Sequence, residues 1–492
     1  MPDLRRQVLE SGKTISRKAA SREGSGRTSR TNSAQNSGQS SRNTSRNASR
    51  QGSDDEDAGS LSDDTAVSLG SLDDENPELE NSNWAQELDE VVGDILDRKR
   101  SSVFGREETY AAYCRLSKFH YVEESVRRRI SDLLAAFARS IRTESSVREA
   151  TLALRALELL AITAQDYTIF EHAEPLLTRS IRDSSSNSIK AAAIHCLGTC
   201  TMFGGAGDDG IQDQMTFLLD IVASDGQSID AHDDSACVTA ALQEWGFMAT
   251  EIEDLENESE DSIQIFIDQL TSNEPNVQIA AGENIALLYE KSYTPQEDED
   301  DEGEPEEDID GEKRRGSDSD EEAPSTGPRL LKRYTPYHNT WELANQLQAL
   351  ATVHTRRLNK RDKKNLHSKF AAIRTTVANP RRGPMYNKAI DQYTGRHYGG
   401  KLTVKIGKEG VMHIDRWWKW IRLNSLRRVL QGGFTVHYFE GNNAVLDNLP
   451  VVMVRPQDPT DRSAYKKAAK IRNGRRDWAA REISPAYDDY DD

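Results

Sequence analysis

The sequence predicts an all-α protein: a stack of repeated helix pairs, then a smaller, basic and mostly helical C-terminal module, with long disordered segments. Three observations support this prediction. One helical pattern recurs between residues 144 and 291. Hydrophobic residues make up only 36% of the 492-residue chain and the mean hydropathy is −0.74, which indicates long polar segments. The net charge is −19, but the charges are strongly segregated along the chain.

The recurring pattern is a β-branched residue that opens a helix, followed three positions later by alanine. It occurs at Val147/Ala150, Ile189/Ala192, Val238/Ala241 and Val277/Ala280, with openings 42, 49 and 39 residues apart. A second apolar helix precedes an opening, as at 212–223 and 262–271. This period is close to the roughly 40–47 residues of HEAT and armadillo repeats, and small residues let neighbouring helices approach. We therefore expect a HEAT/armadillo-like α-solenoid at 84–292; an ordinary helical bundle is the alternative.

Residues 1–83 are predicted to form a disordered tail that is basic at first and then acidic. Residues 1–52 contain 11 Lys or Arg and 3 acidic residues, whereas residues 53–90 contain 14 acidic residues and no Lys or Arg. Neither part can bury enough apolar surface to offset its ordering entropy. A repeated Arg-x-x-Ser spacing makes Ser33, Ser45, Ser49 and Ser53 candidate phosphorylation sites, although simple Ser/Arg low complexity explains the spacing equally well.

Ordered structure is expected to begin near Trp84. Apolar periodicity predicts helices over 86–98, 106–119 and 123–142, ahead of the repeats. After the repeats, residues 293–328 are predicted to be a solvated acidic linker, because 297–310 is nearly all acidic. Within it, Ser317 follows a basic run and Ser319 precedes acidic residues, so both are candidate phosphorylation sites.

The charge balance reverses after the linker, with 32 Lys or Arg against 11 acidic residues in 329–482. We expect a basic module at 329–455, with helices over 341–355 and 415–430, the latter ended by Gly432 and Gly433, and a short strand over 401–406. Trp417 and Trp420, three residues apart, should face inward. Residues 456–492 should supply a basic helix at 461–481 and an acidic tail.

Two basic runs are the candidate nucleic-acid contacts, because cations pair with phosphates while aromatic faces stack on bases. The predicted RNA- or ribosome-binding residues are Arg356, Arg357, Lys360, Arg361, Lys363 and Lys364 in the first run, and Lys466, Lys467, Lys470, Arg472, Arg475 and Arg476 in the second. RNA is favoured over duplex DNA, since no DNA-reading module is recognisable. The alternative is a solvated basic face over a Trp-rich core.

No catalytic, cofactor-binding or metal-binding residues are predicted, so we expect a protein that is not an enzyme. Cys196 and Cys200 are four residues apart beside His195, but no second pair of ligands follows, and buried core cysteines are the better interpretation. The Gly204–Gly207 loop lacks the Lys-Ser/Thr of a phosphate-binding loop and precedes two aspartates. No apolar run could span a membrane and no secretory signal is present, so reduced cysteines and a cytoplasmic or nuclear location are expected.

The chain resembles the interferon-related developmental regulator family, over about Trp84 to Val452 with a gap at the acidic linker. In the first part the resemblance rests on Arg106–Tyr110, Glu149–Leu154 and Ile189–Ala193. In the second part, Asn359–Lys364 with Phe370 is similar to the family's basic motif and its following Phe, and Ile414–Trp417 with Leu426, Leu430 and Gly433 is similar to the segment that closes the family domain. The Arg/Ser-rich tail and residues 395–410 depart from the animal members, which suggests a fungal-type member.

The resemblance implies a helical-repeat protein without enzymatic activity, from a family associated with ribosomes that are not translating and with nuclear co-regulation of transcription. We therefore expect a ribosome-associated regulator whose partners are the ribosome or its RNA, with further protein partners on the solenoid and no membrane, cofactor or small-molecule substrate. The alternative is a nuclear transcriptional co-regulator that acts as a protein–protein interaction scaffold.

Overall fold

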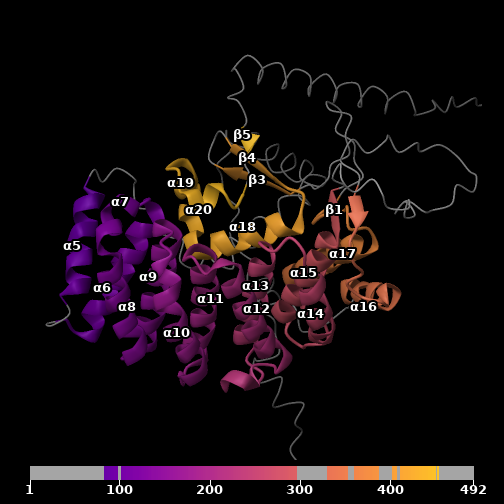
Figure 1. Cartoon of the computed structure of the whole chain (residues 1–492), viewed down its shortest axis with the longest axis horizontal. Helices are drawn as coiled ribbons and strands as arrows, with labels where there is room; N and C mark the ends of the chain where they lie inside the picture. Colours follow the sequence, from indigo (N-terminus) through magenta and orange to yellow (C-terminus); the bar gives the residue numbers. More distant parts are fainter. Residues whose placement is uncertain are drawn as a thin grey trace, which may run out of the picture. The chain divides into compact units, whose positions relative to one another are not determined.

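The computed structural model describes residues 83–97, 101–295, 330–352, 360–386, 402–406, 410–449 and 452–453. Helices dominate this part of the chain, so the predicted all-α class is confirmed, with two small antiparallel sheets added (Figure 1). Among the described residues, no helix combines the length and apolar character needed to cross a membrane.

Helix pairs follow one another along the chain from Trp84 to Lys291, and together we call them the array. They are α5 (Trp84–Leu96) with α6 (Val103–Phe119), α8 (Ile130–Thr143) with α9 (Val147–Ala164), α10 (Thr168–Asp183) with α11 (Asn187–Phe203), α12 (Gly207–Ala223) with α13 (Ser235–Ala249), and α14 (Glu256–Gln269) with α15 (Pro275–Lys291). The second helices, α6, α9, α11, α13 and α15, contact one another in that order, and we call them the inner row. Figure 1 shows the pairs side by side.

Local sequence signals explain where several of these helices begin and end. Ser146 caps α9 by accepting a hydrogen bond from the Glu149 backbone N–H at 2.9 Å, and Asp234 caps α13 in the same way through Cys237. The C-cap residues that follow α8 and α9 are Glu144 and Gln165, both in the left-handed conformation with φ of 45° and 48°. Pro275 opens α15, where a missing N–H costs nothing.

Both residues of the repeat pattern are buried in two of its four members, Val238/Ala241 and Val277/Ala280. Ile189, Val238 and Val277 are buried, but Val147 is 48% exposed because it is the first residue of α9 and the buried face of that helix begins at Glu149 and Ala150. Ala192 is only partly buried, and Ala193 takes the fully buried position in α11. The first repeat is therefore out of register with the pattern, and the close contact in the second lies one residue later.

The helix predicted over 123–142 is interrupted. It divides into α7 (Glu123–Val126), a 3-10 turn η3 (Arg127–Arg129) and α8. Val122, Val126 and Ile130 are all buried on either side of the turn, so packing against the array bends a stretch that local sequence would leave as one helix.

The C-terminal elements pack on the array rather than standing apart from it. They are α16 (Thr340–Thr352), α17 (Lys360–Ala378), α18 (Trp417–Leu430), a 3-10 turn η5 (Gln431–Gly433), α19 (Phe434–Phe439) and α20 (Asn443–Leu446). Helix α17 contacts α15, α18 contacts α9, α13 and α15, and α19 contacts α6. One continuous hydrophobic core therefore joins Leu88 near the start of the array to Leu449.

Strands connect these helices. Strand β1 (Tyr293–Pro295) pairs antiparallel with β2 (Leu330–Lys332), so the first three residues of the predicted linker are a strand, and this pairing holds the two ends of the linker together. Strands β3 (Leu402–Ile406), β4 (Gly410–Ile414) and β5 (Val452–Met453) form a second sheet in that order. The glycines predicted to end α18 instead lie in η5, which leads into α19, and the positive φ of 48° falls on Gln431.

Many predictions concern residues outside the described part. These include the tail at 1–82, most of the linker, the six candidate phosphorylation sites, Arg356 and Arg357, and the whole second basic run from Lys466 to Arg476. They stay predictions, as do the proposed domain boundaries.

Candidate nucleic-acid interface

Helix α17 carries the described part of the first basic run, and α15 fixes its position. Two side chains of α17, Phe370 and Ile373, are fully buried. Gly282 of α15 makes the contact possible, because a Cβ there would lie 2.8 Å from Ile373 Cδ1 and 3.3 Å from Phe370 Cε1. On the same helix, Glu283 accepts a hydrogen bond from Lys369 Nζ at 3.3 Å. A helix held in this way presents its opposite face to solvent in one orientation.

The solvent face of α17 is basic. Lys364 is exposed and lies opposite the buried residues Leu366, Phe370 and Ile373. Arg374 is exposed at the edge of the buried face, and Lys363 is half-buried on the same side as Leu366 and Phe370. Lys360 begins the helix; its side chain and that of Arg361 lie outside the described part. The structure thus places two of the six residues of the first predicted run, Lys363 and Lys364, on one short helical segment, and Arg374 lies ten residues beyond Lys364 on the same helix.

The loop after α17 returns the chain to the array. Thr376 donates a hydrogen bond to the Arg382 carbonyl at 2.5 Å and accepts one from Trp417 Nε1 at 2.7 Å. Gly383 lies so close to the Asp415 carbonyl that an added Cβ would be 1.8 Å from its oxygen. The predicted inward orientation of Trp417 and Trp420 is confirmed, since they are 2% and 4% exposed.

Helix α18 crosses the inner row, and the array caps both of its ends. At the first turn, Glu290 of α15 accepts hydrogen bonds from the backbone N–H groups of Trp417 and Trp418 at 2.8 and 3.1 Å. At the last turn, Arg155 of α9 donates to the carbonyl oxygens of Arg428, at 2.6 Å, and Val429. A carboxylate at the N-terminus and a guanidinium at the C-terminus both complement the helix dipole.

A buried ionic network lies beneath the last turns of α18. Glu244 of α13 is fully buried, and its Oε1 contacts Arg428 Nη1 and His195 Nδ1, the latter at 2.7 Å. Gly198 makes room for this carboxylate, because a Cβ there would lie 2.0 Å from Glu244 Oε2. Burial, with a further contribution from Glu158, raises the pKa of Glu244, and burial lowers the pKa of Arg428 to about 10.

Several cations of the basic C-terminal region therefore have structural roles. Arg422 donates to Thr250 Oγ1 at 2.8 Å and pairs with Glu251 at 2.6 Å, Lys369 pairs with Glu283, and Arg428 pairs with Glu244. Sequence reasoning missed Glu244 and Glu290 as partners. The available signal for Glu244 was its position as the single acidic residue of α13, whereas α15 contains two acidic residues, Glu283 and Glu290.

Glu290 should make stability depend on pH. Burial is the largest influence and raises its pKa to about 7, against the opposing effects of Arg416 and the two backbone N–H groups; Asp415 raises it further. Between about pH 4.5 and 7, Glu290 keeps its proton in the folded chain but has lost it in the unfolded chain. The free energy of unfolding therefore falls as pH rises through this window, by up to about 3 kcal/mol.

Glu290→Gln should remove this part of the pH dependence, because an amide cannot ionise but keeps one acceptor oxygen for the cap. Denaturant unfolding of both proteins between pH 4.5 and 8 measures the difference. We expect the variant to gain stability relative to the wild type as pH rises; two parallel stability curves would contradict the assignment.

The cysteines are poorly suited to nucleophilic chemistry. Cys196 and Cys200 are buried with their sulfurs 4.0 Å apart, and burial raises the pKa of Cys114 and of Cys237 to about 12, which keeps these two thiols protonated. Within the described ranges, no group of three or more His, Cys, Asp or Glu side chains is placed to hold a metal ion.

Comparison with known proteins identifies relatives of the chain. A family model described as "Interferon-related developmental regulator (IFRD)" matches residues 43–378, which is more than half of the sequence. An uncharacterized protein of Schizosaccharomyces pombe is 23% identical over 374 residues, which cover 76% of each chain. Helix α17 ends at Ala378, so it lies within the family match, whereas α18 and the similar segment from Ile414 to Gly433 lie beyond it.

Proposed function

The chain belongs to the interferon-related developmental regulator family, and from this membership we propose that it is a ribosome-associated scaffold that binds RNA through α17 and acts without catalysis. The family resemblance supports the choice of ribosomes that are not translating. The observation that carries the proposal is the basic solvent face of α17, with Lys364 and Arg374 exposed on a helix that the core holds in place.

The mechanism would be occupancy of an RNA surface. Exposed, clustered cations repel one another unless a polyanion is near, and ribosomal RNA is an abundant polyanion. The remaining members of the first run, Arg356, Arg357, Lys360 and Arg361, precede or begin the same helix and would extend the contact. The second run, Lys466 to Arg476, would supply a further RNA contact.

Changing Lys360, Arg361, Lys363 and Lys364 together to Glu should abolish co-sedimentation with ribosomes at physiological salt and leave the helical circular dichroism spectrum unchanged. For the wild type, the logarithm of affinity should fall with the logarithm of salt concentration by roughly 0.7–0.9 per neutralised phosphate. The matched control changes four exposed arginines of the array, Arg127, Arg128, Arg139 and Arg142, to Glu. If the α17 variant still pellets with ribosomes, α17 is only a solvated basic face.

A nuclear co-regulator is the second candidate, and the acidic surface of α12 and α14 favours it. Asp213, Asp220 and Asp261 are exposed there, and such a surface repels nucleic acid and suits a protein partner. Sedimentation of the tagged protein in a sucrose gradient separates the two functions: ribosomal fractions favour the first, and nuclear protein complexes favour the second.

A further inference from the structure

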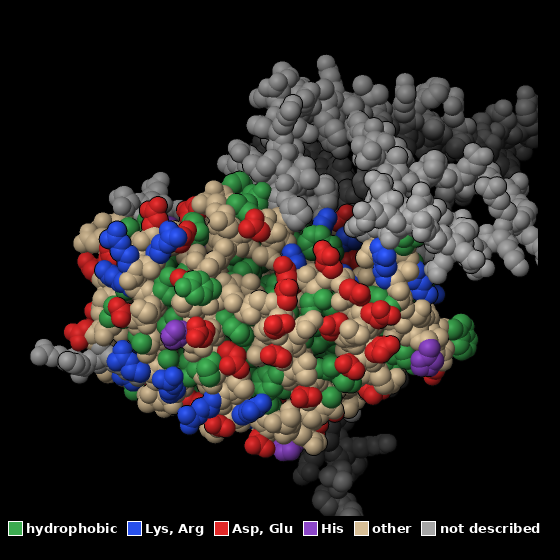
Figure 2. All heavy atoms as spheres, in the orientation of Figure 1, with side chains coloured by type: hydrophobic (Ala, Val, Ile, Leu, Met, Phe, Trp, Pro, Cys, Tyr) green, Lys and Arg blue, Asp and Glu red, His purple; other side chains and the backbone are tan. Residues whose placement is uncertain are grey.

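The second half of the array has an extreme charge balance. Residues 191–290 contain 20 Asp or Glu and no Lys or Arg. In Figure 2, Asp and Glu side chains are spread over the face formed by α12 to α14, whereas Lys and Arg lie mainly toward the two ends of the array. The C-terminal helices neutralise some of these acids, including Glu244, Glu251 and Glu283, but the exposed acids of α12 and α14 face solvent.

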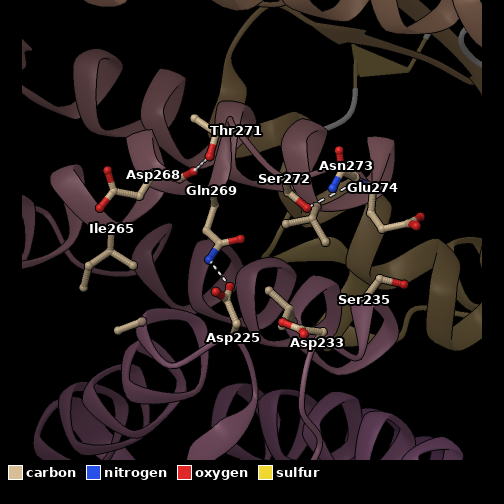
Figure 3. A pocket seen from close by; sticks show the side chains of 13 residues that line it. Asp225, Asp233, Ser235, Ile265, Asp268, Gln269, Thr271, Ser272, Asn273 and Glu274 are labelled. Atoms are coloured by element: carbon tan, nitrogen blue, oxygen red, sulfur yellow. Dashed lines mark hydrogen bonds between the residues drawn. The ribbon is translucent and has the colours of Figure 1, made fainter. Parts of the chain in front are cut away.

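A cavity of about 650 Å³ opens within this acidic region, between the turn that joins α12 to α13 and the turn that joins α14 to α15. Four carboxylates line it. Asp225 and Asp233 come from the first turn, Asp268 from the end of α14 and Glu274 from the residue before α15. Figure 3 shows Asp225 and Asp233 below the open space, and Asp268 and Glu274 at its two sides with their carboxylates pointing outward.

The carboxylates that line the cavity retain free acceptor capacity. None of the four makes an ion pair within the described part of the chain. Glu274 occupies the N-cap position of α15 without capping it. Asp225 accepts one hydrogen bond, from Gln269 at 2.5 Å, and Asp268 accepts one, from Gln264 at 2.9 Å. Each carboxylate can accept further donors from a ligand.

Gln269 presents a further acceptor to the cavity. The residue is only 8% exposed, and its amide nitrogen donates to Asp225 and to the Val222 carbonyl, the latter at 3.1 Å. Its amide oxygen accepts no hydrogen bond from any residue of the described part, and Figure 3 shows it directed away from Asp225 toward the open space. This oxygen is open to the cavity, so a ligand that carries N–H groups can donate to it.

We propose that this cavity binds an arginine-rich extended segment of a partner protein. A guanidinium offers five N–H donors in a planar fork, enough to reach Gln269 and more than one carboxylate. The aliphatic stem of arginine would lie along Val238, Ile265 and Val277, which also line the cavity. The acidic face continues beyond the cavity, so a segment with several arginines matches it better than one small cation.

The test uses the full chain and a fluorescent peptide in which several arginines are separated by Ser and Gly. Anisotropy titrations should show saturable binding to the wild type and none for the same peptide with Gln in place of Arg. The triple variant D233N/D268N/E274Q should bind about tenfold more weakly or worse, since it loses three charge contacts. The control D94N/D132N/E171Q removes the same charge from exposed positions outside residues 191–290 and should change affinity by less than about threefold.

Three outcomes would overturn the proposal: no binding to the wild type, equal losses in both triple variants, or displacement of the peptide by spermine as effectively as by unlabelled peptide. The last two would mean that only the general acidic field attracts cations. The proposal does not rest on the RNA contact, so the four-Glu variant of α17 should bind the peptide as the wild type does.

Discussion

Replacing Arg428 with methionine is expected to lower the free energy of unfolding by about 3–5 kcal/mol. The guanidinium is the cation that faces Glu244, whose side chain is fully buried, and Glu158 lies close enough to raise the pKa of Glu244 further. Methionine fills much of the volume of the arginine stem but leaves Glu244 without this charge partner, and an uncompensated buried charge carries a penalty of this size.

A variant of the neighbouring residue Arg427 separates the contribution of the Glu244 ion pair from the general effect of removing a charge. Arg427→Met removes the same charge from the same turn of α18, yet Arg427 makes no ion pair within the described residues, so we expect a loss below about 1 kcal/mol. The double variant R428M/E244Q should recover part of the loss, because a neutral amide no longer needs a cation. Chemical denaturation of the wild type, R427M, R428M, E244Q and R428M/E244Q measures these differences. If the double variant loses the sum of the R428M and E244Q losses, the pairing is contradicted.

This pairing also marks the limit of prediction from the sequence. Apolar periodicity and breaking residues are local, and they predict helix class and bounds well: the helix expected over 86–98 is Trp84–Leu96, and that expected over 415–430 is Trp417–Leu430. The contact between Glu244 and Arg428 joins residues 184 positions apart. One sequence carries no local sign of such a contact beyond a lone acid in an apolar helix.

The same limit explains the basic C-terminal region. Its composition predicts a surface for polyanions, and this stays a prediction; in the described part of α17, Lys364 and Arg374 are exposed. Composition cannot separate such residues from Lys369, Arg422 and Arg428, which are paired with acids of the array. The acidic cavity was missed for a related reason: Asp225, Asp233, Asp268 and Glu274 lie in or beside two different turns, which only the packing of neighbouring helix pairs brings together.

Trp417→Ala is expected to lower the free energy of unfolding by about 3–5 kcal/mol, because it empties the corner where α15, α17 and α18 meet. Trp417 is 2% exposed, its indole N–H donates to Thr376 at 2.7 Å, and its backbone N–H occupies one oxygen of Glu290 at 2.8 Å. Trp417→Phe keeps most of the apolar volume but loses the indole hydrogen bond, so we expect a smaller loss of stability than for alanine. The lost hydrogen bond should cost about 1 kcal/mol, and the unfilled volume adds a further cost.

Trp341 provides the matched control, since it is 78% exposed at the start of α16 and its change to Ala should shift stability by no more than about 0.5 kcal/mol. Thermal and denaturant unfolding compare the three variants with the wild type. Because α18 and α17 share this corner, the proposed RNA binding should also weaken for the Trp417→Ala protein at temperatures where it begins to unfold, whereas it should not for the Trp341→Ala protein. Equal stability losses at Trp417 and Trp341 would show that α18 does not hold the C-terminal helices on the array.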